Sequence, residues 1–249
     1  MMLPRIVLAA ALGLCALRAD AGEVRVAVAA NFTAPLKEIA ALFQADTGHT
    51  VQASYGATGK FYAQIRNGAP YDVLLAADDA TPARMAAEGL AQGPSRFTYA
   101  VGKLVLWSRA PGTVDARGEV LNGSFGKLAI ANPRLAPYGA AAQETLQKLG
   151  LWNRVQGRIV MGENISQTLQ FADSGAADLA FVAMSQTFRD GKPVGGSVWV
   201  VPQTLYAPIR QDAVLLARPQ DQAAAVAFMK YLKSAKAVRV IRRFGYGLP

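Results

Sequence analysis

Two residue types that supply much of enzyme and metal chemistry are almost missing from this chain of 249 residues. It has one cysteine, Cys15, and one histidine, His49. The common zinc patterns need several such ligands and are therefore excluded. A Ser-His-Asp arrangement would have to use His49, which follows Gly48 in a predicted turn, and no G-x-S-x-G motif is present. We expect His49 to be an exposed turn residue and expect no catalytic residue.

Phosphate-binding signatures are absent as well, because neither a GxGxxG nor a Walker A pattern occurs. The carboxylates of Asp72, Asp78 and Asp79 could bind a hard cation through oxygen. Such residues more often end a strand and cap the next helix, here near Thr81-Pro82. We favour this capping interpretation.

The chain has only one long apolar run, residues 6–17, and it lies near the N-terminus. Arg5 precedes the run, and Ala19-Asp20-Ala21 follows it as a small-x-small pattern. These features predict a secretory signal peptide over residues 1–21, too short to span a membrane. A retained anchor helix is the alternative, but charged residues interrupt it.

Cys15 lies inside this predicted signal peptide. A lipoprotein signal needs a small residue before the cysteine, and here the residue is Leu14. We therefore expect simple cleavage before Gly22 and a periplasmic protein without thiols, which suits an oxidising compartment.

Basic residues exceed acidic ones by 26 to 17, which gives a formal net charge of +9. The basic residues are dispersed, and the densest group, within 233–243, fits the solvated face of a helix. Nucleic-acid binding is hard to reconcile with export, so we expect no nucleic-acid partner. The charge would steer anions weakly at physiological salt.

Short apolar runs alternate with amphipathic stretches along the rest of the chain. Apolar residues in 35–46 recur with helical spacing, whereas 72–77 is almost continuously apolar, as in buried parallel strands. The predicted strands are 24–30, 50–55, 72–77, 103–107, 127–132, 158–162, 178–183, 198–201 and 212–217. The predicted helices are 35–46, 59–67, 138–149, 165–174 and two closing helices beyond 220. This alternation predicts an α/β fold with mostly parallel sheets.

These strands could form one doubly wound sheet or two lobes. Two long extended segments, 101–112 and 206–219, carry proline and glycine at their ends and could cross between lobes. We therefore favour two lobes, although composition does not establish that the chain returns to the first one.

In four places a predicted strand runs into a donor-rich turn and a helix start. Each turn presents free backbone N–H groups at the positive end of a helix dipole, beyond the carboxyl end of a strand. Any single turn is more often an ordinary cap, but the set of four predicts an anion site built from neutral donors. The turns are 29–33, 55–60, 131–140 and 162–166.

Long stretches resemble the periplasmic molybdate-binding proteins of ABC importers. They include VAANFTAPLKEIAALF (28–43), YGATGK (55–60), LAIANPRLAPYGAAAQETLQKLGLW (128–152) and FMKYLKSAKAVRVIRRFGY (228–246). The resemblance covers essentially the whole chain after the signal peptide. It implies a two-lobed type II periplasmic binding protein fold, each lobe a mostly parallel sheet flanked by helices. The first lobe would comprise 22–103 plus 208–249 and the second 104–207, with the ligand in the cleft.

The same resemblance implies four ligand contacts. Asn31 stands where the first turn supplies a hydroxyl or amide donor, and Thr58 stands at the hydroxyl position of the second turn. Tyr138 and Ile165 match the backbone donors of the third and fourth turns.

Three further positions are weaker candidates: Ala57 beside Thr58, Asn164 before Ile165, and Ala183. Some relatives carry a tyrosine at the position of Ala183, whose methyl group cannot donate a hydrogen bond. Because Ala183 lacks that hydroxyl group, the sequence leaves open whether there is a fifth ligand contact and how the site selects among similar oxyanions.

Molybdate is a fully deprotonated tetrahedral dianion at neutral pH, so its oxygens only accept hydrogen bonds and a donor-only pocket suits it. Burial of the charge must be offset by charge-assisted hydrogen bonds and helix termini. Glu163 is the only acid next to a proposed contact, and we expect it to face away from the ligand.

We interpret the chain as a non-enzymatic, monomeric binding protein that carries molybdate, and also tungstate, to the membrane permease of an ABC importer. No cofactor is expected, and no metal other than that of the oxyanion. Another oxyanion, sulfate first, is the alternative within the binding class. A small-carboxylate dehydratase is the alternative outside it, and would need an acid or base with an arginine clamp. Arg66, Arg134 and Glu163 are the nearest candidates, and none lies on a proposed contact.

The signal-peptide interpretation predicts that the exported protein begins at Gly22. Intact-mass and N-terminal peptide mass spectrometry would check this. An uncleaved N-terminus, or a lipid on Cys15, would contradict it.

Overall fold

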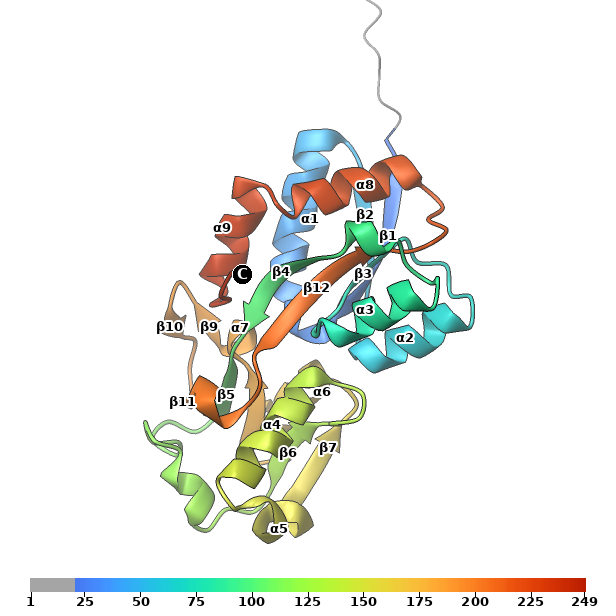
Figure 1. Ribbon diagram of the computed structural model, residues 1–249. Helices are drawn as coiled ribbons and strands as arrows, with labels where there is room; N and C mark the ends of the chain where they lie inside the picture. The colour runs from blue at the N-terminus through green and yellow to red at the C-terminus, as the bar shows by residue number, and fades with distance from the viewer. Residues whose placement is uncertain (1–20) are drawn as a thin grey trace, which may run out of the picture.

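The computed structural model describes residues 21–249, so the predicted signal peptide, apart from its last residue, lies outside the described residues. Two five-stranded sheets form separate lobes, with strand orders β2-β1-β3-β12-β4 and β11-β5-β8-β6-β7 (Figure 1). Helices flank both sheets, which confirms the predicted two-lobed α/β fold. In the part of the chain that the structure describes, no helix is long and apolar enough to cross a membrane.

The first lobe is built around the parallel strands β1 and β3, whose side chains are mostly buried. β1 pairs in parallel with β2 and β3, and β12 pairs antiparallel with β3 and β4. Its strands are β1 (Glu23–Ala29), β2 (Thr50–Gly56), β3 (Val73–Leu75), β4 (Phe97–Gly102) and β12 (Ile209–Leu215). Its α-helices are α1 (Thr33–Thr47), α2 (Thr58–Arg66), α3 (Ala80–Ala87), α8 (Gln222–Tyr231) and α9 (Ala235–Arg243).

The second lobe repeats this plan on a smaller scale. β6 pairs in parallel with β7 and β8, while β5 runs antiparallel between β8 and β11. Its strands are β5 (Leu104–Ser108), β6 (Leu128–Ala131), β7 (Ile159–Gly162), β8 (Leu179–Ala183) and β11 (Ser197–Val200), with a short pair β9 (Phe188–Arg189) and β10 (Lys192–Pro193). Its α-helices are α4 (Pro137–Lys148), α5 (Trp152–Val155), α6 (Ile165–Asp173) and α7 (Met184–Thr187). Single 3₁₀ turns are η1 (Ala30–Phe32), η2 (Gly93–Ser95), η3 (Glu119–Asn122), η4 (Gln156–Arg158) and η5 (Gln203–Leu205).

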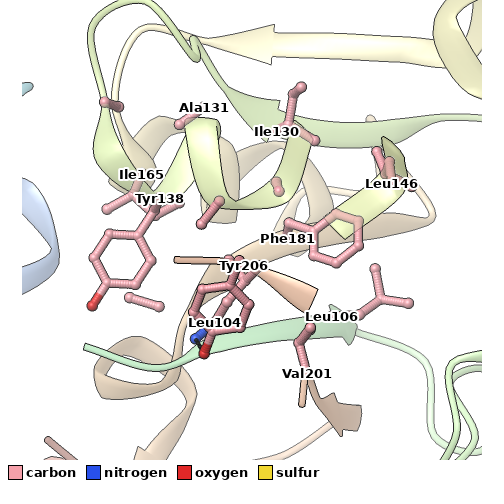
Figure 2. Packing of buried hydrophobic residues seen from close by; sticks show 14 of the residues in the cluster. Leu104, Leu106, Ile130, Ala131, Tyr138, Leu146, Ile165, Phe181, Val201 and Tyr206 are labelled. Atoms are coloured by element: carbon pink, nitrogen blue, oxygen red, sulfur yellow. Dashed lines mark hydrogen bonds between the residues drawn. The ribbon is translucent and has the colours of Figure 1, made fainter. Parts of the chain in front are cut away.

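The core of the second lobe reaches the border with the first lobe. Leu104, Ile130 and Phe181 are completely buried in it. Tyr138 and Ile165 belong to the same cluster, and the Tyr138 hydroxyl is directed away from its aliphatic side chains (Figure 2). Packing of these two residues in the core holds the starts of α4 and α6 in place.

The chain passes between the lobes twice. β4 leads through Lys103 directly into β5, and residues 201–208 lead from β11 back to β12. The second crossing begins earlier than the predicted segment 206–219, because residues 201–208 include the turn η5, and the strand within that segment starts at Ile209. Strand β4 was not predicted as a separate element.

His49 and Asp78 are both partly buried in the first lobe. His49 is half-buried: its Nδ1 accepts a hydrogen bond from the Gly22 N–H at 2.9 Å and its ring stacks on Phe43. The prediction of an exposed turn histidine was therefore wrong. Asp78 accepts a hydrogen bond from the Thr81 N–H at 2.7 Å, as a cap does, and burial raises the pKa of its carboxyl.

Asp72 ties three segments of the first lobe together. Its fully buried carboxylate accepts from the Arg25 N–H at 2.7 Å and from the Gln220 N–H at 2.6 Å. These hydrogen bonds join the approach to β3 to β1 and to the segment after β12.

Replacement of Asp72 by alanine should lower the free energy of unfolding by about 2–4 kcal/mol, because two backbone donors lose their acceptor. Urea denaturation would measure the change. Asp79→Ala is the matched control, since Asp79 is exposed and makes no capping hydrogen bond. Equal stability of the two variants would contradict the prediction.

Candidate anion-binding site

The four predicted turns meet where the lobes face each other. β1 and β2 are parallel neighbours in one sheet and β6 and β7 in the other, so the turns emerge in pairs at the carboxyl edges of the two sheets (Figure 1). The Gly59 N–H donates to the carbonyl of Leu135 at 2.9 Å, which joins the second turn to the third. The Ser166 hydroxyl donates to the carbonyl of Ala30 at 3.3 Å, which joins the fourth turn to the first.

The third turn leaves one particular N–H without a partner. Pro137 opens α4 and has no N–H, and the N–H groups of Gly139 and Ala140 both donate to the carbonyl of Ala136. Gly139 fits tightly, because a Cβ there would lie 2.1 Å from the carbonyl oxygen of Ala131. Among residues 21–249 the N–H of Tyr138, which lies between Pro137 and Gly139, has no acceptor.

In the fourth turn a side-chain cap, instead of a backbone carbonyl, satisfies the N–H groups next to the free donor. Asn164 caps α6, and its Oδ1 accepts from the N–H groups of Ser166 at 2.9 Å and Gln167 at 3.1 Å. Ile165, which lies between the cap and these two residues, keeps its N–H free of any acceptor in the described chain. The Asn164 side-chain oxygen thus acts as a helix cap. It leaves the backbone N–H of Ile165 as the free donor of this turn.

The second turn adds a hydroxyl. Thr58 is 1 % exposed, and its Oγ1 accepts from the Ala77 N–H at 3.0 Å. Within the described residues the hydroxyl hydrogen has no acceptor, so it remains available to a ligand. The carbonyl of the preceding Ala57 accepts from Lys60 and Phe61, whereas the N–H groups of Ala57 and Thr58 have no partner in residues 21–249.

The first turn differs from the sequence expectation. Asn31 is buried, but both hydrogens of its side-chain amide are engaged, by Gln211 Oε1 at 2.8 Å and by the Tyr246 hydroxyl at 2.9 Å. Its backbone N–H has no acceptor in the part of the chain described here. The free donor of this turn is therefore the backbone rather than the amide side chain.

Ala183 contributes no free donor. Its N–H donates to Gln186 Oε1 at 3.0 Å. The neighbouring Ser185 instead supports the first turn, because its hydroxyl donates to the carbonyl of Asn31 at 2.9 Å. Sequence reasoning did not identify Ser185, Gln211 or Tyr246; the only available signal was the pair of polar residues, Gln211-Asp212, in an apolar strand.

Comparison with known proteins identifies the family of this protein. Residues 24–247 match the family model of bacterial extracellular solute-binding proteins. The chain belongs to this family. This membership confirms the expectation of a binding protein that is not an enzyme, and it agrees with a site of donors without a catalytic group.

Two curated relatives and one solved structure cover nearly the whole chain. The molybdate-binding protein ModA of Azotobacter vinelandii is 56% identical, over 99% of this chain and 98% of that protein. ModA of Rhodobacter capsulatus is 53% identical, over 96% of this chain and 93% of that protein. The structure of the periplasmic molybdate-binding protein of Azotobacter vinelandii superimposes with a TM-score of 0.89 and 44% identity, over 91% of this chain and 99% of that one.

The site of this solute-binding protein is electrically neutral. Burial raises the pKa of the Tyr138 and Tyr246 hydroxyls well above the ordinary value, so both remain protonated at neutral pH. Glu163 is 65% exposed and pairs with Lys60 at 2.7 Å, as expected of a side chain that faces away. No cluster of metal-ligating side chains occurs in residues 21–249.

An open hollow of about 320 Å³ lies between the lobes beside these turns. Its lining includes Asp78, Glu144 and Arg134, whereas Arg66 lines a different hollow. Asp79 and Arg210 line it as well, so acidic and basic side chains surround this hollow together, and Arg66 and Arg134 are not brought together as a clamp. The buried turns offer free donors without a carboxylate and are the better candidate site.

Proposed function

We propose that this protein captures molybdate, and tungstate with its similar shape and charge, between its two lobes. The observation that carries the proposal is the convergence of unpartnered N–H groups from both lobes on a buried, neutral region that also holds the Thr58 hydroxyl. Such donors stabilise an anion through charge-assisted hydrogen bonds and helix dipoles. The curated names of both close relatives agree with this ligand.

We assign the Thr58 hydroxyl and the backbone N–H groups of Asn31, Tyr138 and Ile165 as the ligand contacts, with the N–H of Ala57 as an additional donor. Three of these four contacts do not depend on the side chain. No charged side chain neutralises the ligand, so the hydrogen bonds must offset the cost of burying a dianion.

The same geometry accounts for selectivity against phosphate. Phosphate still carries a proton at neutral pH and needs an acceptor, but the Glu163 carboxylate is already paired with Lys60 outside the site. Sulfate has only acceptor oxygens and remains the alternative ligand. Its smaller size would leave the donors of the two lobes too far apart.

We further propose that the protein works as a periplasmic monomer and delivers its ligand to the permease of an ABC importer. The contacts Gly59–Leu135 and Lys60–Glu163 require the lobes to be close together. Closure around the ligand would thus create the surface that the permease recognises.

Molybdate affinity should change little between about pH 6 and pH 8, because no proposed contact titrates in that range. Isothermal titration calorimetry of ligand-free protein would test this, with phosphate at large excess as competitor. Strong competition by phosphate would reveal an acceptor in the site and contradict the proposal, and tighter binding of sulfate than of molybdate would favour the alternative.

Thr58→Ala should weaken molybdate binding by about ten- to a hundred-fold. The variant loses one hydrogen bond to a charged ligand, which contributes roughly 1.5–3 kcal/mol, and each 1.4 kcal/mol corresponds to a factor of ten. The same calorimetric titration measures the effect, and the melting temperature without ligand checks that the fold is intact.

Glu163→Gln is the control for this experiment. It removes an exposed charge on the rim of the site and should leave the affinity nearly unchanged, because exposed ion pairs contribute little. Normal binding by Thr58→Ala together with loss of binding by Glu163→Gln would mean that the site uses a carboxylate. The dehydratase or protonated-ligand hypothesis would then be preferred.

A further inference from the structure

Gln211 is a completely buried polar residue in β12, the strand that comes from the crossing between the lobes. The pairing of β12 with β4 shifts register between Gln211 and Asp212, a bulge that allows both neighbours to be buried. Asp212 bonds to Arg96 at 2.7 Å and Thr98 at 2.6 Å within the first lobe. Gln211 makes no contribution to that ion pair and is directed to other partners.

The partners of Gln211 belong to different lobes. Its Oε1 accepts from Asn31 Nδ2 at 2.8 Å and from the Tyr99 hydroxyl at 3.1 Å, both in the first lobe. Its Nε2 donates to the hydroxyl of Tyr138, in the second lobe, at 3.0 Å. Asn31 and Tyr138 each also have a free backbone N–H in the proposed site. The side-chain amide of Gln211 therefore connects one donor turn of the first lobe to one of the second.

The crossing strand β4 leaves room for this connection at Gly102. A Cβ on Gly102 would lie 2.1 Å from the Tyr138 hydroxyl oxygen and 2.7 Å from Gln211 Nε2. The absence of a side chain at this position is therefore an independent indication that the Gln211–Tyr138 hydrogen bond is built into the crossing.

We propose that Gln211 is a positioning residue that sets the relative placement of Asn31 and Tyr138, so that backbone donors of the two lobes meet on the same anion. Its hydrogen bond to Asn31 lies within one lobe, whereas its hydrogen bond to Tyr138 forms only when the lobes are close. Gln211 thus adds a neutral contact that favours the closed form without touching the ligand. This inference rests on the proposed function.

Gln211→Met keeps the length of the side chain but removes both polar atoms, and Tyr138→Phe removes the hydroxyl that Gln211 bonds while the backbone N–H stays. Tyr138→Phe should weaken molybdate binding about ten-fold, the effect of losing one buried hydrogen bond. Gln211→Met should weaken it at least as much, because it also removes the hydrogen bonds to Asn31 and Tyr99. The double variant should bind no more weakly than the weaker single one, because both changes break the same hydrogen bond. Gln203→Met changes an exposed glutamine in the segment that leads into β12, and this variant should bind like the wild type.

Backbone amide NMR shifts separate positioning from general loosening of the fold. Molybdate should shift the amides of Asn31, Tyr138 and Ile165 in the wild type. In Gln211→Met the shifts of Asn31 and Tyr138 should shrink while that of Ile165 remains. If this variant does not fold, Tyr138→Phe tests the same hydrogen bond by the same shifts.

Additive effects in the double variant, wild-type affinity of Gln211→Met, or equal loss of all three shifts would overturn the role of Gln211. Failure of the wild type itself to bind molybdate would overturn the proposed function, so the two failures are distinguishable.

Discussion

The start of a helix leaves several backbone N–H groups without partners inside the helix, and burial of such a group requires an acceptor from elsewhere. In this protein four helix starts from two lobes are buried against each other, and at each one the local structure satisfies the neighbouring donors while leaving one or two free. The proline at 137 and the Asn164 cap achieve this by different means. An anion bound between the lobes would supply the missing acceptor to all four turns at once.

This constraint also explains why the region around the site is polar yet uncharged. Asn31, Gln211, Tyr138 and Tyr246 are buried and bonded to one another, so they hold the first and third turns without adding charge. A lysine or arginine in their place would attract any anion, including protonated ones. Neutral donors in fixed directions respond instead to an ion whose oxygens only accept.

The sequence was sufficient to predict most secondary-structure elements and the positions of the four turns. It was not sufficient to predict the hydrogen-bond partners of the side chains. The strand and helix periodicities predicted most elements to within a few residues, and the parallel arrangement placed the four turns at the sheet edges. The partners of Asn31 could not be predicted, because Gln211 and Tyr246 lie 180 and 215 positions away in the chain. The half-buried position of His49 likewise depends on a contact with Gly22 that no local pattern indicates.

A binding site made largely of main-chain donors also has an unusual relation to mutation. Ala57 and Ile165 could be replaced by residues of similar size, because their backbone N–H groups would still donate the same hydrogen bonds. The path of the backbone has to be conserved instead. It is fixed by residues such as Gly139, where even a methyl group would collide with the carbonyl of Ala131. In such a protein, ligand specificity would restrict the glycines and the capping residues more than the residues that contact the ligand. A change of ligand by design would then require loops of a different backbone shape, not substitution of the contact residues.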